Sequence, residues 1–219
     1  MITVTAFNWV PDFARGVVRD VRVRWALEEM GRPYKVRLID HETKNSADYR
    51  GTQQPFGQVP VLQDGDLTLF ESGAILLHLA NQSEALAPAE ANARARVTAW
   101  LFAALNSMEP AISQLGGVDL FYARQDWAKG ARPVYEAAVS ARLASLSGWL
   151  DGREWLEANR FTVADLIMSM VLRNLKHTDL VSGHAVLGPY LERCLARPAF
   201  ARALEAHLAD LTGAPPAAM

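Results

Sequence analysis

The 219-residue sequence contains one cysteine, Cys194, and carries a net charge of only −2 at neutral pH. A single cysteine excludes an intrachain disulfide and is typical of a reducing compartment. The nearly balanced charge gives no electrostatic reason to expect binding to nucleic acid or to an anionic membrane. The five histidines have no close metal-ligand spacing. We therefore predict neither a metal site nor a nucleic-acid partner.

Long apolar runs are also missing. The longest apolar-looking segment, residues 166–172, is far too short to span a bilayer. The N-terminal residues, MITVTAFNW, lack a basic region followed by an apolar run, so no signal peptide is evident. Apolar residues make up 50% of the chain and charged residues 21%, which is ordinary for a globular protein. We expect a soluble, cytoplasmic protein of one or two domains.

The most informative stretch is residues 56–81, FGQVPVLQDGDLTLFESGAILLHLAN. Two apolar-rich runs, 59–62 and 67–70, flank an Asp-Gly pair, and this pattern predicts a β-hairpin with a two-residue type I′ turn. Ser72 then opens a predicted helix whose apolar positions cover most of its circumference. Such a helix is buried on more than one side.

Pro60 and the Glu71-Ser72 pair suggest a binding site around this hairpin. Proline belongs at a strand start or edge, and a cis Val59–Pro60 bond would leave the backbone of Val59 able to pair with an extended peptide ligand. The predicted helix N-terminus and the Ser72 hydroxyl favour a ligand carboxylate. Glu71 could accept a ligand ammonium. Together these features describe a site for a small zwitterionic peptide.

Gln58-Val59-Pro60 followed by Glu71-Ser72 across an Asp-Gly hairpin resembles the glutathione-binding half of the glutathione S-transferase superfamily. The resemblance implies that Gln58 and Val59, with Pro60, bind the cysteinyl backbone of glutathione. It implies that Glu71 and Ser72 bind the γ-glutamyl end. It also implies glutathione as co-substrate, a small electrophile as second substrate and a homodimer. The alternative interpretation is a plain hairpin that leads into a core helix.

The order of predicted elements agrees with this resemblance. Strands are expected at 2–7 and 34–39 on either side of a helix from about Arg19, with a short helix near residues 46–50. With the hairpin and the helix at Ser72, the order is βαβαββα. That order matches the α/β thioredoxin-like fold of the family's N-terminal domain, here residues 1–80.

After a linker at 81–90, the rest of the chain, 91–219, is predicted to be an all-helical domain. Thr162-Val163-Ala164-Asp165 has the form of a capping box and is a second point of resemblance to the family. The final GAPPAAM is expected to be frayed. The other predicted elements of this domain are helices at 91–112, 133–150, 162–175, 187–195 and 198–211.

The loop after the first strand departs from the family pattern. Many members place Tyr, Ser or Cys there to lower the thiol pKa of glutathione, whereas residues 8–20 contain no Tyr, Ser, Thr or Cys. Arg15 could stabilise a thiolate by its charge, and Asn8 could donate a hydrogen bond to it. Backbone N–H groups around Gly16 are a third source of donors. We predict Arg15 and Asn8 as catalytic residues, against the alternative that Arg15 is ordinary surface.

Two further groups of residues have both a functional and a structural interpretation. Aromatic residues could line a pocket for the electrophile or could belong to the core: Trp9, Phe13, Phe121, Tyr122 and Trp127. Polar residues could reach the glycyl carboxylate of glutathione or could form a solvated loop: His41, Lys44, Gln53 and Gln54. Cys194 is interpreted as a core residue.

The resemblance favours a glutathione transferase that conjugates the glutathione thiolate to a small electrophile, a reaction of detoxification. The missing Tyr, Ser or Cys favours an alternative: a non-catalytic glutathione-binding or regulatory protein that keeps the transferase fold. A glutathione-dependent reductase would usually need a cysteine near the first helix, and none is present there. The sequence does not identify the electrophile.

Overall fold

The structure is a computed structural model that describes residues 1–216 and divides into two compact units. The first unit combines residues 1–86 with residues 198–216. The second unit is Ala87–Arg197. The sequence analysis had placed all of residues 91–219 in one helical domain, whereas here the last helix packs with the first unit.

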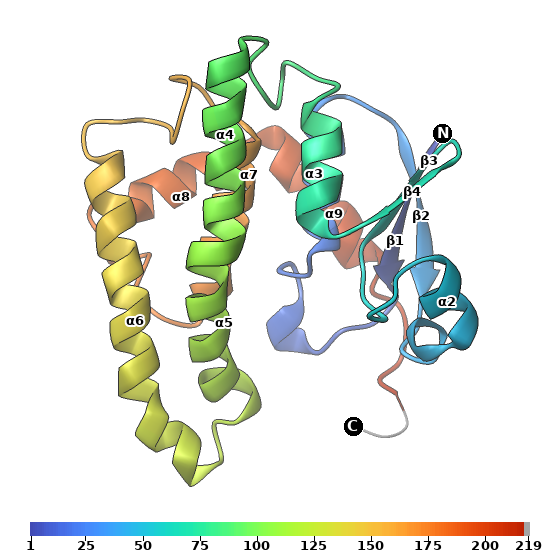
Figure 1. The fold of residues 1–219 in the computed structure, drawn as a ribbon. Helices are drawn as coiled ribbons and strands as arrows, with labels where there is room; N and C mark the ends of the chain where they lie inside the picture. The colour runs from blue at the N-terminus through green and yellow to red at the C-terminus, as the bar shows by residue number, and fades with distance from the viewer. Residues whose placement is uncertain (217–219) are drawn as a thin grey trace. The chain divides into compact units, whose positions relative to one another are not determined.

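The first unit contains a four-stranded sheet with the strand order β2-β1-β3-β4 (Figure 1). β1 pairs with β2 in parallel and with β3 antiparallel, and β4 is antiparallel to β3. The predicted order βαβαββα and the thioredoxin-like fold class are confirmed. The elements are β1 (Ile2–Phe7), α1 (Asp20–Glu29), β2 (Tyr34–Ile39), α2 (Ala47–Thr52), β3 (Val61–Asp64), β4 (Leu67–Phe70) and α3 (Ser72–Ala80), with short 3-10 turns at Asp12–Ala14 and Thr43–Asn45.

The β3–β4 hairpin differs in detail from the prediction. Asp64 pairs with Leu67, so the two-residue loop is Gly65-Asp66 rather than Asp64-Gly65. Only Gly65 has a positive φ, +63°, which is the pattern of a type II′ turn and not of the predicted type I′ turn. β3 also begins after Pro60, because proline has no N–H to donate to the ladder.

The C-terminal helix α9 (Pro198–Asp210) packs on α1 in the first unit. The rings of Phe200 and Trp25 lie 4.8 Å apart between centroids, and Trp25 is fully buried. Beyond α9, the N–H of Gly213 donates to the backbone oxygen of Asn8 over 2.8 Å. The prediction that residues 213–219 are frayed is therefore wrong for Gly213, and residues 217–219 lie outside the described part.

The second unit is helical, as predicted (Figure 1). The expected single helix over 91–112 is interrupted by a π turn, Ala104–Met108. Pro110 explains the interruption, because a proline cannot donate to the carbonyl one turn earlier and its ring crowds that carbonyl. The helices are α4 (Ala91–Ala103), α5 (Glu109–Gly116), α6 (Asp126–Leu150), α7 (Val163–Leu172) and α8 (Leu187–Leu195), with a second π turn at Gly117–Phe121 and a 3-10 turn at Arg173–Leu175.

α6 begins at Asp126, well before the predicted start at Pro133, and keeps the proline inside the helix. Ala128 is buried in this added segment, and an ion pair of 2.9 Å joins Asp126 to Lys129. The burial of Ala128 and the acidic residue in the first turn stabilise the helix and offset the loss of the one hydrogen bond that Pro133 cannot make. The predicted start of this helix at residue 133 is therefore wrong.

The predicted capping box at Thr162 is confirmed. Thr162 Oγ1 accepts from the N–H of Ala164 (3.2 Å), and Asp165 Oδ2 accepts from the N–H of Thr162 (2.9 Å). Burial raises the pKa of the Asp165 carboxyl. Cys194 is also fully buried, and burial raises the pKa of its thiol, as a core residue requires.

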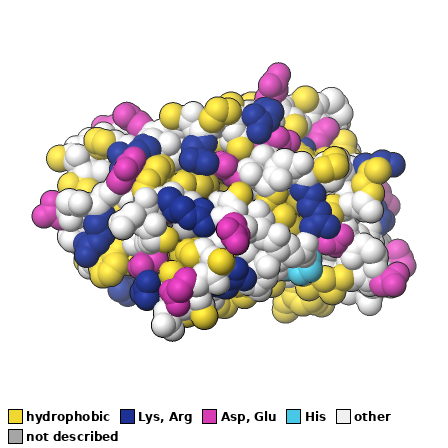
Figure 2. Space-filling model, turned by 90° about the horizontal axis from the view of Figure 1, so that it is seen from above, with side chains coloured by type: hydrophobic (Ala, Val, Ile, Leu, Met, Phe, Trp, Pro, Cys, Tyr) yellow, Lys and Arg dark blue, Asp and Glu magenta, His cyan; other side chains and the backbone are white. Residues whose placement is uncertain are grey.

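The surface carries charges of both signs. Figure 2 shows acidic and basic side chains interspersed on the face that it displays, in keeping with the net charge of −2. Within residues 1–216, no helix combines the length and the apolar character needed to cross a membrane.

Candidate functional site

Ser72 and Arg22 meet at the N-terminus of α3. Ser72 is the first residue of the helix and is 4% exposed, while Arg22 lies on α1 and is 1% exposed. Arg22 Nη1 donates to Ser72 Oγ over 3.3 Å. A buried guanidinium therefore adds its charge to the positive end of the helix, and both features favour a carboxylate at this position.

Sequence reasoning missed Arg22. Its signal is the alternation Val21-Arg22-Val23-Arg24-Trp25, which places two arginines among apolar residues. All five of these residues are buried. Arginine is almost never buried without a specific partner, so this pattern could have indicated a buried ionic site.

Glu71 precedes α3 with an unusual backbone conformation, φ +67°. Non-glycine residues rarely adopt a positive φ, and such residues are concentrated at functional sites because the surrounding structure must hold them there. The side chain is exposed. Glu71 therefore presents a carboxylate to solvent immediately beside the Ser72 hydroxyl.

The Val59–Pro60 peptide bond is cis, as the sequence analysis expected. The β1–β3 ladder begins at the pair Thr5–Val61, so the N–H and C=O of Val59 lie outside it. The Val59 side chain is buried against Tyr49 in a small cluster of the first unit. The backbone of Val59 thus belongs to a fixed segment at the end of the sheet.

Gln58 is held from the side of α2. The hydroxyl of Tyr49 donates to the backbone oxygen of Gln58 over 2.7 Å. The side-chain oxygen of Gln54 accepts from the N–H of Gln58 (3.2 Å) and from the N–H of Phe56 (2.6 Å). Tyr49 is 1% exposed, and burial raises its pKa to about 12, so the hydroxyl keeps its proton at neutral pH.

These bonds give Gln54 a structural role. Gln54 is 2% exposed and orders the loop, so the alternative of a solvated loop residue is wrong for it, and its contact with the glycyl carboxylate stays a prediction. Gln53 accepts from Gln63 over 3.3 Å. His41 stacks on Phe7 at 4.9 Å, and burial, aided by the nearby Lys44, lowers the pKa of His41.

The segment 8–16, the first part of the loop between β1 and α1, carries the predicted catalytic residues. Its backbone is anchored where the N–H of Asn8 donates to Ile39 O over 3.0 Å. At the other end, Gly16 has φ +75° and donates its N–H to Nε2 of His207 over 3.3 Å. The Gly16 amide is therefore already engaged within the protein, whereas Asn8 and Arg15 stay predictions as catalytic residues.

The five predicted pocket aromatics fall into different units. In the first unit, Trp9 lies edge-on to His41 at 5.9 Å. In the second unit, the rings of Tyr122 and Trp127 are 5.1 Å apart, and both side chains are about half exposed, as is the more exposed Phe121. Their role in an electrophile pocket stays a prediction.

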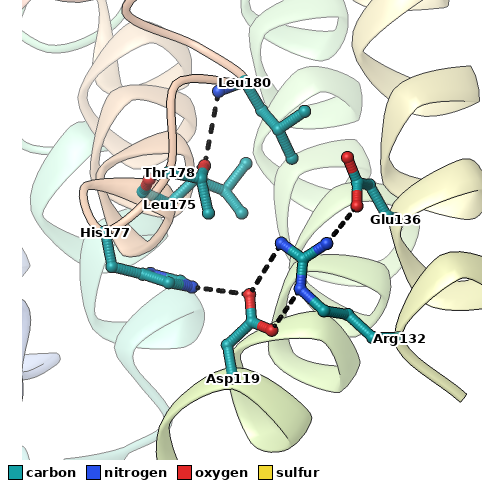
Figure 3. Close-up of polar contacts among 7 residues, drawn as sticks. All are labelled: Asp119, Arg132, Glu136, Leu175, His177, Thr178 and Leu180. Atoms are coloured by element: carbon teal, nitrogen blue, oxygen red, sulfur yellow. Dashed lines mark hydrogen bonds and ion pairs between the residues drawn. The ribbon is translucent and has the colours of Figure 1, made fainter. Parts of the chain in front are cut away.

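A separate polar cluster lies in the second unit (Figure 3). Asp119 accepts from Arg132 Nε (2.8 Å) and pairs with His177 Nε2 (3.1 Å), and Arg132 also bonds to Glu136. These residues line a cavity of about 590 Å³. One guanidinium bonds to two carboxylates in this cluster, and these bonds, with His177–Asp119, tie the second π turn to α6 and to the segment after α7. Among the described residues, no group of three or more His, Cys, Asp or Glu side chains is arranged to hold a metal ion.

The chain is similar to glutathione transferases over most of its length. A family model described as the N-terminal domain of glutathione S-transferase matches residues 4–81. Glutathione S-transferase 3 of Zea mays is 30% identical over 198 residues, which are 85% of this chain and 88% of that protein. Glutathione S-transferase 1 of Zea mays is 37% identical over 97 residues, a match of 43% of this chain that spans less than half, 45%, of that protein.

Solved structures show the same similarity. A glutathione transferase from Burkholderia graminis, with two glutathione molecules bound per subunit, has a TM-score of 0.78 at 27% identity and covers 93% of this chain and 87% of its own. The nitrogen regulation fragment of the yeast prion protein Ure2p has a TM-score of 0.75 at 22% identity, covering 93% of this chain and 96% of that one. At this identity, the similarity to the Ure2p fragment shows only a shared fold.

The fold combines a thioredoxin-like unit, with a cis-proline directly before β3, and a helical unit, which is the architecture of glutathione transferases. With the similarity to the maize enzyme over most of both chains, the chain belongs to the glutathione S-transferase family.

Proposed function

We propose that this protein is a glutathione transferase, which joins the sulfur of glutathione to a small electrophile. The observation that carries the proposal is the buried Arg22–Ser72 pair at the N-terminus of α3, next to the strained and exposed Glu71. A hydroxyl, a guanidinium and helix N–H groups suit the carboxylate of an α-amino acid group. Glu71 suits its ammonium, so the residues present fit the γ-glutamyl end of glutathione.

The remaining residues have complementary roles in this proposal. The backbone of Val59, with Gln58 and Pro60, holds the middle of the peptide by main-chain hydrogen bonds. Arg15 and Asn8 lower the pKa of the bound thiol by positive charge and hydrogen bonding, and the thiol proton passes to solvent. The protein would act in the cytoplasm as a homodimer.

Titration with glutathione, followed by the ultraviolet absorbance of bound thiolate across pH, tests both binding and activation. We expect Ser72→Ala to weaken binding by about 1–3 kcal/mol, because a charge-assisted hydrogen bond is lost. Ser145→Ala, an exposed serine on α6, is the matched control and should bind as the wild type does. An unchanged dissociation constant for Ser72→Ala would contradict the assignment of the glutathione site to the N-terminus of α3.

Arg15→Ala separates activation from binding. We expect turnover to fall more than glutathione affinity, and the bound thiol to titrate at higher pH, because a charge near the sulfur favours the thiolate. Unchanged turnover in this variant would make Arg15 a surface residue without a catalytic role.

A second candidate function is a glutathione-binding or regulatory protein without transfer activity. The absence of Tyr, Ser, Thr and Cys from residues 8–20 favours it, and the fold shared with the Ure2p regulatory fragment is compatible with it. Glutathione binding with an unshifted thiol pKa in the wild-type protein would favour this candidate over the transferase.

A further inference from the structure

The C-terminal end of the chain holds both ends of the segment 8–16 of the β1–α1 loop. The N–H of Gly213 donates to the backbone oxygen of Asn8 over 2.8 Å. The N–H of Gly16 donates to Nε2 of His207, on α9, over 3.3 Å. The segment that carries the groups proposed to contact sulfur is therefore bonded at each end to a residue far along the chain, 205 positions later for Asn8 and 191 positions later for Gly16.

The geometry defines the protonation of His207. Nε2 accepts a hydrogen bond from Gly16, so it carries no proton, and the ring proton is on Nδ1. Nδ1 lies 3.0 Å from Oδ2 of Asp20, which also accepts from Nε of Arg24 over 2.8 Å. His207 is 2% exposed and Asp20 is fully buried. Asp20 thus selects one neutral tautomer and orients the ring.

The partners of this contact are themselves rigidly placed. α9 is docked on α1 by the Trp25–Phe200 ring contact and by the Arg202–Glu28 ion pair of 2.7 Å. Gly16 has φ +75°, a conformation that glycine adopts readily and other residues do not. The backbone conformation of Gly16 therefore sets the direction of its N–H, and the hydrogen bond to the His207 imidazole holds that conformation in place.

We propose that His207, oriented by Asp20, is a positioning residue of the proposed transferase. Its imidazole fixes the Gly16 amide and thereby the direction in which the β1–α1 loop presents Asn8 and Arg15 to the sulfur of glutathione. The proposal rests on the proposed function, and it assigns no contact between His207 and the substrate.

The first test is hydrogen exchange of the Gly16 amide in the wild type and in His207→Ala, His207→Gln and Thr162→Ala, without glutathione. We expect the protection of Gly16 to fall about threefold to tenfold in His207→Ala, as for one lost hydrogen bond. It should recover in His207→Gln, whose side-chain oxygen can accept the same N–H. Thr162→Ala lowers the stability of the second unit without touching α9 or the loop, and there Gly16 should keep its protection relative to neighbouring amides.

The second test measures kinetics with glutathione. We expect kcat of His207→Ala to fall about threefold to tenfold while KM for glutathione changes less than about twofold, since the binding groups at Val59 and Ser72 are untouched. In His207→Gln, kcat should return most of the way to the wild-type value. Thr162→Ala should keep the wild-type kcat despite a lower melting temperature, a separation that a merely structural role of His207 would not produce.

Unaltered Gly16 protection in His207→Ala would overturn the proposal, as would lost protection with unchanged kcat and bound-thiol titration. If His207→Ala does not fold, the nitrogen chemical shifts of His207 in the wild type decide, and an Nε2–H tautomer would contradict the assignment. A wild-type protein that leaves the thiol pKa of glutathione unshifted would refute the proposed function. The exchange data would still show whether His207 holds the loop.

Discussion

Tyr49 shows how one buried hydroxyl can hold a binding segment. It lies on α2, is almost inaccessible, and donates to the backbone oxygen of Gln58, next to the cis-proline. The phenol is both a packing group for Val59 and the donor that satisfies a loop carbonyl. A side chain of this kind transmits the rigidity of the core to a segment that has no ladder hydrogen bonds of its own.

Replacement of Tyr49 by Phe should keep the packing and remove the donor. We expect the free energy of unfolding to fall by about 1 kcal/mol and glutathione binding to weaken, because the carbonyl of Gln58 loses its partner. Denaturant unfolding and calorimetric titration measure the two effects. Phe56→Leu, an exposed aromatic in the same loop, serves as control and should change neither quantity by much. Unchanged glutathione affinity in Tyr49→Phe would contradict the inferred support of Gln58.

The raised pKa of Tyr49 also predicts a pH dependence. Burial shifts this pKa from an ordinary value of 10.0 to about 12, so the folded protein retains the phenol proton longer than the unfolded chain does. The stabilisation is complete below about pH 10 and is lost as the pH rises through about 12. The difference in unfolding free energy between wild type and Tyr49→Phe should therefore shrink between these values, and a constant difference would contradict the buried hydroxyl.

At the scale of single elements, the N-terminus of α7 depends on its capping box. Thr162→Ala removes the acceptor for the N–H of Ala164, and loss of such a cap costs about 1 kcal/mol. We expect a melting temperature about 2–4 °C lower for a chain of this size. Thr98→Ala, which loses a mid-helix hydroxyl bonded to Arg94 O, is the matched control and should shift the melting temperature less. An equal shift in both variants would mean that the box adds no special stability.

Local chemistry explains which elements the sequence predicted. The capping box at Thr162 and the Pro60 strand start depend on neighbouring residues, and both are found as expected. The start of α6 before Pro133 depends on burial of Ala128 against other helices, which a sequence pattern does not show. The same holds for Arg22, whose partner Ser72 lies on another helix. The Glu71-Ser72 motif was readable because a helix start and its charge preference are local properties.

At the scale of the whole chain, the first unit is assembled from both ends of the sequence. α9 contributes Phe200 against the buried Trp25 and Asp210 against the buried Arg24, whose ion pair measures 2.8 Å. No local sequence pattern in residues 198–216 predicts these contacts, because each depends on a partner near the start of the chain. For this reason the predicted division at residue 91 grouped α9 with the other helices.

A fragment of residues 1–86 alone should therefore not fold stably. Removal of α9 exposes Trp25 and leaves the carboxylate and guanidinium of Asp20 and Arg24 without their C-terminal partners. We expect weak near-ultraviolet circular dichroism and poor chemical-shift dispersion for this fragment. Fusion of residues 198–216 to it through a flexible linker should restore both signals. A well-folded 1–86 fragment would show that α9 is dispensable for the first unit.

The single, fully buried cysteine can report on the opening of the second unit. Cys194 lies in α8, and a thiol-reactive dye meets no accessible protein thiol while the second unit is folded. In the absence of glutathione, the rate of dye incorporation thus measures the opening of that unit alone, with no background from another cysteine. When glutathione is present, its consumption by an electrophile can be followed with the same dye, because the buried Cys194 of the folded protein does not react.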